Sequence, residues 1–430
     1  MDFRARLLRL GELQKRNDQP LAPLSDAADP PLEALVDGEW VSSSGARCFV
    51  SEHLYPLGHD HGGLRLGDLH AVPIDDWAPF IIAEEGQILD PQQSIFVDIE
   101  TTGLARGAGT YAFLVGLGFF EGEHFRLRQC FMPDYADEEA LLDLVAEDLA
   151  HHRGLITFNG RCFDWPIIET RYVLAQREPP CGGSPHLDLL SLSRRLWRRT
   201  LPSCALASLE TSVLGVRRGQ DDVPGYLIPQ LYQDYVRWGH TRPIARIFYH
   251  NLMDILSMVA LAARAGKVIC PSLRQEGDPL CDHISLGAFY EVIGRYEDAS
   301  HAYRLALEHG HSAEDIAAAS KRLSALLKRL GRYDEAMEIW RARIPGDEIY
   351  PYLELAKQLE HRLREYAEAR HVIQEAITWV RTRDVLLGEQ ERQRLMADLR
   401  HRLARVDRRL AEVNGYDNPG TGPERCSREG

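Results

Sequence analysis

The stretch SIFVDIETTGLARGAG, residues 94–109, decides how the rest of the chain is interpreted, because it sets two carboxylates in a buried strand. Side chains alternate between the two faces of a strand, so Asp98 and Glu100 project from one face while Val97 and Ile99 project from the other. Neighbouring carboxylates repel each other unless a cation lies between them, and their hard oxygen atoms suit Mg²⁺ or Mn²⁺. The alternative is a strand whose polar face is only solvated.

The length and composition describe a globular protein of more than one domain. The chain has 430 residues, of which 44% are hydrophobic and 27% are charged, and domains of ordinary size would number two or three. The net charge of -14 argues against nucleic-acid binding by overall electrostatic attraction. A polyanion would therefore be held by a local basic patch or through bound metal.

Neither a membrane span nor a secretion signal is expected. The longest apolar run, YAFLVGLGFF at 111–120, is about half the length that a bilayer requires. The N-terminal MDFRARLLRL is a basic amphipathic pattern without the apolar core of a secretory signal. The eight cysteines show no zinc-binding spacing and are expected to be reduced thiols. We therefore expect a cytoplasmic protein that has no membrane partner.

From residue 94 onward the expected elements follow the order of a ribonuclease H-like fold. A three-stranded meander is followed by a helix, a strand, a helix, a short strand and further helices. We place these elements at 94–100, 110–120, 124–133, 137–152, 154–160, 164–175 and 185–190, with the last helix ending at Gly266. The expected domain, residues 94–268, is an α/β fold with a mixed five-stranded sheet and flanking helices.

Residues 1–93 are expected to form an N-terminal extension with a proline-rich linker and short strands. Its HDHGG segment, residues 59–63, contains two histidines that suggest either a metal site or a loop. His59 and His61 have no further ligand close to them in the sequence, so a loop is the stronger interpretation.

Residues 280–413 carry an internal repeat that predicts an all-α region. The segments IGRYEDASHAYRLALE from 293, LGRYDEAMEIWRARIP from 330 and LREYAEARHVIQEAIT from 363 superpose without gaps. Their spacing brackets the period of tetratricopeptide repeats, and a shared small alanine lets paired helices approach closely. We expect tetratricopeptide-like repeats, with a helical bundle of accidental similarity as the alternative. Residues 414–430 are expected to be a disordered tail.

Two later stretches supply further polar side chains. FNGRCFDWPII, residues 158–168, sets Asn159 after a strand and Asp164 at the start of a helix. YHNLMDILSMV, residues 249–259, sets His250 and Asp254 four residues apart, on one face of a helix. An amphipathic helix with a solvated polar side has the same pattern, so this pair gains its weight from following the other motifs.

Together these motifs resemble those of the DEDD 3′-5′ exonuclease superfamily. Asp98 and Glu100 match its first motif, residues 159–164 match the second, and Asp254 matches the third. Residues 94–265 also resemble the YprB ribonuclease H-like domain proteins, some of which carry C-terminal tetratricopeptide repeats. The resemblance implies a nuclease that hydrolyses phosphodiester bonds in DNA or RNA from a single-stranded 3′ end.

The catalytic residues would then act by a two-metal-ion mechanism. Asp98, Glu100 and Asp254 would hold the Mg²⁺ or Mn²⁺ ion that activates the attacking water, and Asp98 and Asp164 would hold a second ion. Four carboxylates around two divalent ions are close to charge balance.

The general base is less obvious, because this chain departs from the superfamily pattern. The superfamily places a tyrosine four residues, or a histidine five residues, before the last aspartate, whereas here His250 and Tyr249 are exchanged. We assign the base to His250, because imidazole accepts a proton near neutral pH and the helical spacing directs it toward Asp254. Tyr249 is the alternative.

Contacts to nucleic acid are expected from residues beside the carboxylates: Thr101, Thr102, Gly103, Asn159 and Phe163. The first three can present backbone N–H groups and a hydroxyl to the terminal nucleotide, or form an ordinary strand exit. Asn159 would be equally at home as a turn residue. Asp188 can support Asp164 or act as an acid at a helix N-terminus. The arginines within 194–199 can follow a nucleic-acid backbone with Trp197 as a stacking plate, or form a solvated helix face.

Three functions remain open from the sequence. The favoured one is a metal-dependent 3′-5′ exonuclease whose repeats bind a protein partner. A catalytically inactive scaffold would be indicated by the loss of a metal-binding carboxylate, yet all four are present. An endonuclease on the same fold is the third.

Overall fold

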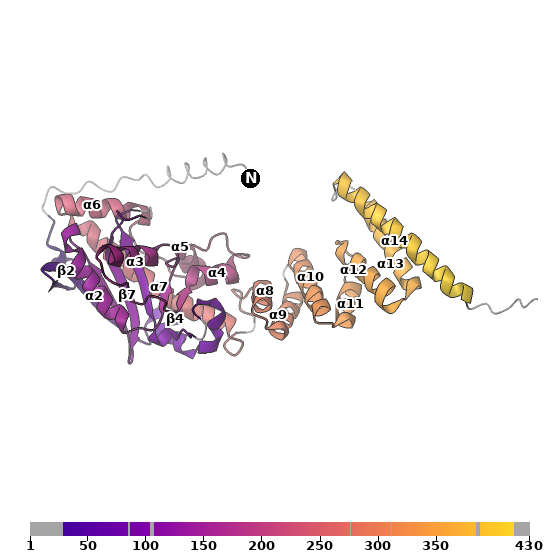
Figure 1. Ribbon diagram of the computed structural model, residues 1–430, viewed down its shortest axis with the longest axis horizontal. Coiled ribbons are helices and arrows are strands. Elements are labelled where there is room, and N and C mark those ends of the chain that lie inside the picture. Colours follow the sequence, from indigo (N-terminus) through magenta and orange to yellow (C-terminus); the bar gives the residue numbers. More distant parts are fainter. Residues whose placement is uncertain are drawn as a thin grey trace, which may run out of the picture. The chain divides into compact units, whose positions relative to one another are not determined.

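The computed structural model describes residues 29–84, 87–103, 107–275, 277–310, 312–383 and 388–416, with side chains as far as 413 (Figure 1). The chain divides into two compact units. The first contains the described residues up to Leu189 together with Leu209–Arg264, and the second contains Leu190–Ser208 and the described residues from Ala265 onward. The amphipathic N-terminus, most of the proline-rich linker and nearly all of the expected tail lie outside the described residues.

Within the described residues, the first unit is built on an eight-stranded sheet with the order β1-β2-β8-β7-β6-β9-β10-β5. The strands are β1 (Glu39–Ser43), β2 (Ala46–Pro56), β5 (Ile81–Ile82), β6 (Ile95–Thr101), β7 (Ala112–Glu121), β8 (His124–Phe131), β9 (Leu155–Thr157) and β10 (His186–Asp188). Strand β9 runs parallel to β6 and β10, and the other pairs are antiparallel. The expected mixed α/β sheet with the ribonuclease H-like order is confirmed.

The sheet is larger than the expected five strands, because β1, β2 and β5 come from residues before 94. Strand β2 pairs along β8, and its residues Cys48, Phe49 and Val50 are at most 4% exposed. These apolar side chains belong to the same core as β6 and β7, so this part of the expected extension belongs to the ribonuclease H-like fold. A separate two-stranded hairpin, β3 (Asp60–His61) and β4 (Leu64–Arg65), carries His61.

Helices cover both faces of the sheet. The main ones are α2 (Glu138–Ala150), α3 (Asp164–Leu174), α6 (Ile228–Trp238) and α7 (Thr241–Ile269), together with the short α5 (Leu206–Leu209). On β8, Arg128 donates to Asp148 of α2, whereas the neighbouring Gln129 donates to the carbonyl oxygen of Phe248 in α7. Because adjacent side chains in a strand point to opposite faces, α2 and α7 lie on opposite sides of the sheet.

Helix α7 continues beyond Gly266, where the sequence predicted its end. The helix runs to Ile269, and the backbone N–H of Cys270 still bonds to the carbonyl oxygen of Gly266. Val268 and Ile269 are each 1% exposed. The prediction was wrong because burial of these apolar residues outweighs the weak helix propensity of one glycine.

The second unit is all-helical in its described residues, as expected. Figure 1 shows its helices after residue 280 following one another in chain order as far as the long terminal helix α14. They are α4 (Leu189–Trp197), α8 (His283–Val292), α9 (Tyr296–Glu308), α10 (Ala313–Arg329), α11 (Tyr333–Ala342), α12 (Tyr350–Gln358), α13 (Tyr366–Thr382) and α14 (Glu389–Tyr416). Helices α9, α11 and α13 begin at the three tyrosines that the repeat aligns.

The residues before these tyrosines show why the repeat forms helical pairs. Gly294, Gly331 and Arg364 occupy equivalent places, two residues before each tyrosine, and all have positive φ angles of 57° to 78°. This left-handed conformation ends one helix and lets the next begin. Ala299, Ala336 and Ala369 are fully buried at the corresponding contact positions. The internal repeat is therefore a repeat of structure.

The arginine-rich segment after β10 also belongs to the second unit. Trp197 is 1% exposed, and its indole N–H donates to the carbonyl oxygen of Leu280 at 3.0 Å. Arg199 pairs with Asp282 at 2.6 Å and with Asp315 at 2.7 Å. The interpretation of Trp197 as a stacking plate for nucleic acid is wrong, because burial leaves its ring no open face.

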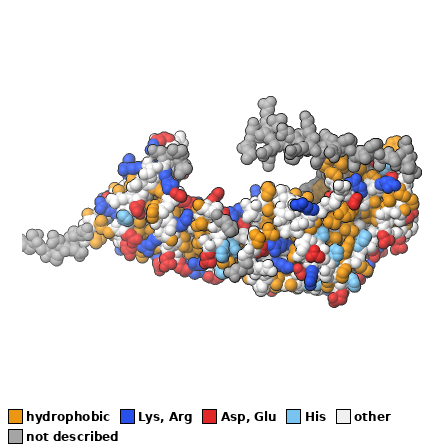
Figure 2. Space-filling model, turned by 180° about the vertical axis from the view of Figure 1, so that it is seen from behind, with side chains coloured by type: hydrophobic (Ala, Val, Ile, Leu, Met, Phe, Trp, Pro, Cys, Tyr) orange, Lys and Arg blue, Asp and Glu red, His pale blue; other side chains and the backbone are white. Residues whose placement is uncertain are grey.

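On the face shown in Figure 2, basic and acidic side chains are interspersed over the described residues.

Among the helices that the structure describes, none combines the length and the apolar composition needed to cross a membrane. In the same residues, the seven cysteines are all free thiols.

Candidate metal centre

Strand β6 directs the first two carboxylates toward helix α7. Asn251 of α7 donates its side-chain amide to Asp98, at 2.8 Å from Oδ2 and 3.2 Å from the backbone oxygen. Asn251 is fully buried and also accepts from Gln129 at 2.8 Å. Strand β7 makes room for it with Gly116, where a Cβ atom would come within 2.2 Å of Asn251 Oδ1. Glu100, two residues along β6, lies on the same face as Asp98.

The turn between β9 and α3 places the third carboxylate. Asn159 has a φ of 63°, and its backbone N–H donates to Asp188 at 3.0 Å. The next residue, Gly160, lies so close to the helix start that a Cβ atom would be 2.5 Å from Thr157 and 2.8 Å from Asp164 Oδ2. Asp164, at the first position of α3, is 6% exposed. The turn formed by residues 158–163 therefore places a buried carboxylate at the N-terminus of α3.

Helix α7 supplies His250 and Asp254 one turn apart. His250 Nε2 lies 3.5 Å from Asp254 Oδ2 and 3.9 Å from Glu100 Oε1. One possible ligand atom from each of Glu100, His250 and Asp254 lies within 4.8 Å of the other two. The side chains of these three residues are 12% to 16% exposed. Residues about 150 positions apart in the sequence thus lie close together in one small site.

The electrostatics of the site favour the arrival of a cation. Burial raises the pKa of Asp98, Glu100, Asp164 and Asp254. Neighbouring carboxylates raise the pKa of the first three further, and Asp188 and Asp254 contribute to a pKa of about 8 for Asp164. These acids repel each other when ionised, so their charged state needs positive charge between them.

The donor set fits divalent metal. Asp164 is only 6% exposed. Within the described residues, its side chain has neither a hydrogen-bond donor nor a cationic partner. A buried carboxylate without a partner is costly, and an ion with oxygen ligands removes that cost. Asp98, Glu100 and Asp254 lie close enough to Asp164 to interact with it electrostatically, and they offer further oxygen atoms. Sequence reasoning predicted all four carboxylates and His250 at this place.

Sequence reasoning missed a chain of polar contacts that connects Asp254 to the N-terminal hairpin. Arg218 forms an ion pair with Asp254 Oδ1 and donates to both oxygens of Glu210, at 2.6 and 2.8 Å. Glu210 accepts from the Ser257 hydroxyl at 2.6 Å, and that hydroxyl lies 2.9 Å from His61 Nε2. Because the hydroxyl hydrogen goes to the carboxylate, His61 must donate to Ser257. His61 is thus buried in support of the site rather than in an open loop.

Arg218 brings a positive charge into contact with Asp254. Its side chain is 10% exposed, and that of Glu210 is 2% exposed. Burial lowers the pKa of Arg218, but Asp254 and Glu210 raise it by more, so the guanidinium stays charged. Arg218 occupies only Asp254 Oδ1 and leaves Oδ2 facing His250. Nothing in the motif spacing indicated Glu210, which lies in a π-helical turn, or Arg218, which lies in an irregular segment.

The residues expected to contact substrate are partly engaged by the protein itself. The Thr101 hydroxyl donates to Gly103 at 2.8 Å, and Thr102 exchanges two bonds of 3.0 Å with Tyr111. These bonds shape the strand exit, and residues 104–106 beyond it are outside the described part. The left-handed Asn159 forms the turn that sequence analysis gave as its alternative, and Phe163 is partly buried against the core.

The comparisons with known proteins place this site in a family. Residues 95–265 match the family model of the RNase_H superfamily. Over 373 residues the chain is 30% identical to the uncharacterized protein YprB of Bacillus subtilis (strain 168), a match that covers 85% of this chain and 86% of that protein. The chain belongs to the YprB family. Because the first unit ends at Arg264, a YprB match of this length must include much of the helical region.

Membership of the YprB family and of the RNase_H superfamily supports a nuclease or another hydrolase in general terms. The superfamily region, 95–265, contains all four carboxylates and His250. Nucleases with this fold commonly use divalent metal, in agreement with the acidic site described above.

Proposed function

We propose that this YprB-family chain is a metal-dependent 3′-5′ exonuclease that hydrolyses phosphodiester bonds at the single-stranded 3′ end of DNA or RNA in the cytoplasm. The observation that carries the proposal is the buried and unpartnered carboxylate of Asp164 beside three further carboxylates in the described site. The 3′-5′ polarity rests on the resemblance of the three motifs to the DEDD superfamily.

The four carboxylates have separate roles in this proposal. Asp98, Glu100 and Asp254 would hold one ion, and Asp98 with Asp164 would hold the other. Two ions bound there, Mg²⁺ or Mn²⁺, would acidify the attacking water and stabilise the leaving 3′ oxygen. Asn251 fixes the orientation of Asp98 from the other side. Asp188 lies close enough to Asp164 to raise its pKa and supports the turn that holds it.

His250 presents Nε2 to the same space, where it can accept a proton from the attacking water or bind an ion itself. Tyr249 is a weaker candidate, because within the described residues it forms no hydrogen bond with the carboxylates and is turned about 100° from His250 around the helix. Thr101, Thr102, Gly103, Asn159 and Phe163 remain predicted neighbours of the terminal nucleotide.

The proposal is tested by offering end-labelled single-stranded DNA and RNA to the full chain with Mg²⁺ or Mn²⁺. We expect a ladder that shortens from the 3′ end and disappears with a chelator. Asp98→Ala and Asp164→Asn should each lower the rate at least about 100-fold, since each removes a ligand. Equal activity in Asp98→Ala would show that a contaminant is responsible. Products of internal cleavage would favour an endonuclease.

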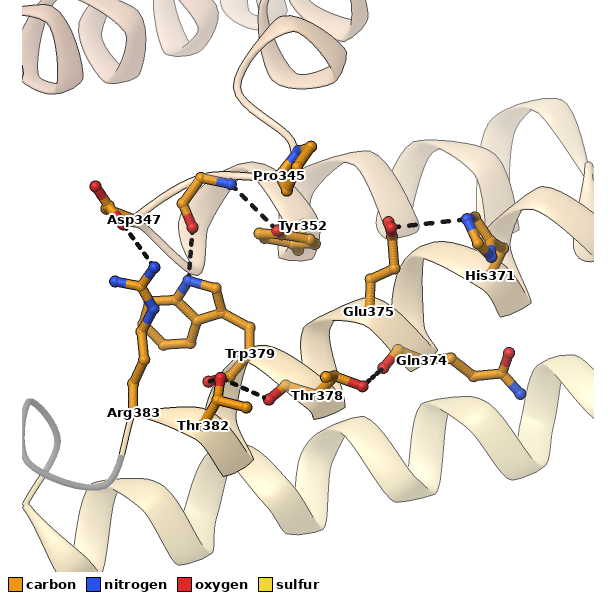
Figure 3. A pocket seen from close by; sticks show the side chains of 11 residues that line it. Pro345, Asp347, Tyr352, His371, Gln374, Glu375, Thr378, Trp379, Thr382 and Arg383 are labelled. Carbon is orange, nitrogen blue, oxygen red and sulfur yellow. Dashed lines mark hydrogen bonds and ion pairs between the residues drawn. The ribbon is translucent and has the colours of Figure 1, made fainter.

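We also propose that the helical repeats bind a protein partner through a peptide segment. The cavity that supports this is about 650 Å³ in volume and is lined by residues of α12, α13 and the loop before α12. Figure 3 shows the Arg383–Asp347 pair on one side, the His371–Glu375 pair on the other, and Tyr352 and Trp379 between them. Both rings are largely buried, at 3% and 9% exposure, so the open lining consists of the charged pairs with Gln374 and Thr378, and it suits an extended peptide with polar and charged side chains.

A peptide library displayed against the full chain tests this second part. Thr378→Arg would fill the cavity and should abolish any selected binding. Ala325→Arg, at an exposed position of α10 that does not line this cavity, should leave it unchanged and is the matched control. Binding that survives Thr378→Arg would show that the peptide site lies elsewhere. If the chain degrades no nucleic acid with any metal but captures a peptide in the cavity, the inactive-scaffold function replaces the nuclease.

A further inference from the structure

His250 lies where a ligand of the metal centre would lie. Its Nε2 atom is 3.5 Å from Asp254 Oδ2 and 3.9 Å from Glu100 Oε1. Donor atoms that share an octahedral ion at about 2.1 Å are separated by about 3 Å when adjacent and by about 4 Å when opposite. The observed separations fall between these values. Glu100 Oε1, His250 Nε2 and Asp254 Oδ2 can therefore meet at one ion after small side-chain movements.

The other ring nitrogen of His250 is held by a carboxylate. Nδ1 lies 2.6 Å from Asp222 Oδ1. An ionised carboxylate only accepts hydrogen bonds, so Nδ1 carries the hydrogen and cannot also accept from Arg218 Nη1, 3.2 Å away. The lone pair of the neutral ring is then on Nε2, facing Glu100 and Asp254. Histidines that bind metals commonly have such a carboxylate on their second nitrogen.

The helix spacing and Arg218 complete the arrangement. His250 and Asp254 are four residues apart, the spacing by which one helix face holds two ligands of the same ion. Arg218 occupies Asp254 Oδ1, which leaves Oδ2 as the oxygen directed at His250. Asp164 supplies a second, independent sign of a ligand, because its carboxylate is deeply buried without a cationic partner among the described residues.

We propose that His250 Nε2 binds one of the metal ions directly, with Asp222 orienting the ring, and that the centre therefore prefers Mn²⁺ or a similar first-row transition ion to Mg²⁺. Imidazole nitrogen is a poor ligand for Mg²⁺, which prefers oxygen, and a better one for transition ions. The assignment gives His250 a different role from that of general base. It rests on the metal site of the proposed nuclease, but it is testable without catalysis.

Pulsed electron paramagnetic resonance of Mn²⁺ bound to the full chain is the direct test, because it detects coupling to a coordinated ¹⁴N nucleus. We expect this coupling in the unaltered protein and its loss in His250→Gln. His61→Gln is the matched control, because His61 joins the same polar network through Ser257 but does not face the carboxylate oxygens. The coupling should persist in that variant. In calorimetric titrations, His250→Gln should weaken Mn²⁺ binding about 10-fold to 100-fold and Mg²⁺ binding less than about 3-fold.

Asp222→Ala provides a second variant that leaves every donor atom in place. It should weaken Mn²⁺ binding about 10-fold, with a smaller effect for Asp222→Asn, whose side chain still accepts from Nδ1. If Mn²⁺ binds without ¹⁴N coupling, and this binding is lost in Asp98→Ala, His250 is not a ligand. The nuclease proposal is then unaffected. Nitrogen coupling in a chain that cleaves no nucleic acid would support the ligand and refute the nuclease. Failure to bind Mn²⁺ at millimolar concentration would overturn the ligand assignment.

Discussion

Asn251 lies between Asp98 and Gln129, and its side-chain N–H is 2.8 Å from Asp98 Oδ2. The same amide accepts from Gln129, so both of its polar ends are used. Asp98 is expected to bridge the two ions, and a bridging carboxylate must present its oxygens in a fixed direction. Asn251 thus links the sheet, helix α7 and the metal centre through one fully buried side chain.

Asn251→Ala should therefore lower both stability and activity. Gln129 and Asp98 would lose a partner inside the protein, which costs about 1–3 kcal/mol in the free energy of unfolding. Urea denaturation in the presence of a chelator measures this cost. Asn251→Ala should also lower kcat while KM changes less, because the bridging carboxylate loses its orientation. A variant with unchanged stability would show that water replaces the amide.

Much of the fold and of the candidate site could be predicted from the sequence. Alternation in β6 separated Asp98 and Glu100 from the core residues, and the order of strands and helices predicted the ribonuclease H-like arrangement. The spacing of His250 and Asp254 predicted their common helix face. These features depend on local periodicity, which a single sequence expresses directly.

The remaining features depend on contacts that no local pattern expresses. Glu210 lies in a π-helical turn and Arg218 in an irregular segment, so neither has a periodicity that directs it toward Asp254. Strands β1, β2 and β5, of which β1 and β5 form the edges, were also missed as parts of the sheet. The pairing of β2 with β8 and of β5 with β10 is a long-range contact, and the short or mixed patterns of these strands resemble those of a linker.

The metal-free protein should lose stability as the pH rises, because of Asp164. Its pKa of about 8 in the fold exceeds the ordinary value of about 3.9 in the unfolded chain. Between these values the folded state keeps a proton that the unfolded state has lost, so the free energy of unfolding falls as the pH rises through this window. Burial lowers the pKa of His186 to about 4 in the fold, against about 6.5 in the unfolded chain, so its opposite effect on stability is largely complete above about pH 7.

The difference in the free energy of unfolding between the unaltered protein and Asp164→Asn separates the effect of this carboxyl group from that of the other titrating groups. In a chelator, Asp164→Asn should be the more stable of the two at pH 8, and the gap should shrink toward pH 6.5. Thermal denaturation at several pH values measures the gap. Adding Mn²⁺ should reverse the order, because the ion stabilises the ionised carboxylate that asparagine lacks. A gap that widens at lower pH would contradict the raised pKa.

Arg218→Met should destabilise the first unit through Glu210. The carboxylate of Glu210 is 2% exposed and would keep only the Ser257 hydroxyl as a partner among its described contacts. Breaking a buried ion pair in this way costs about 3–5 kcal/mol. The double variant Arg218→Met/Glu210→Gln removes both charges and should recover at least half of the loss, as measured by urea denaturation. Equal instability of the single and double variants would show that the guanidinium acts mainly by packing.

Ala336→Leu should destabilise the helical region, because this alanine sits fully buried at the contact between paired helices of the repeat. Three extra carbon atoms in a closed contact cost about 1–3 kcal/mol through displaced neighbours. Ala325→Leu, on an exposed position of α10, has the same change in size and should alter the free energy of unfolding by less than about 0.5 kcal/mol. Helical circular dichroism during urea denaturation distinguishes the two. If both variants unfold at the same urea concentration, the small alanine is not required for the helices to pack, and the resemblance to tetratricopeptide repeats loses its physical basis.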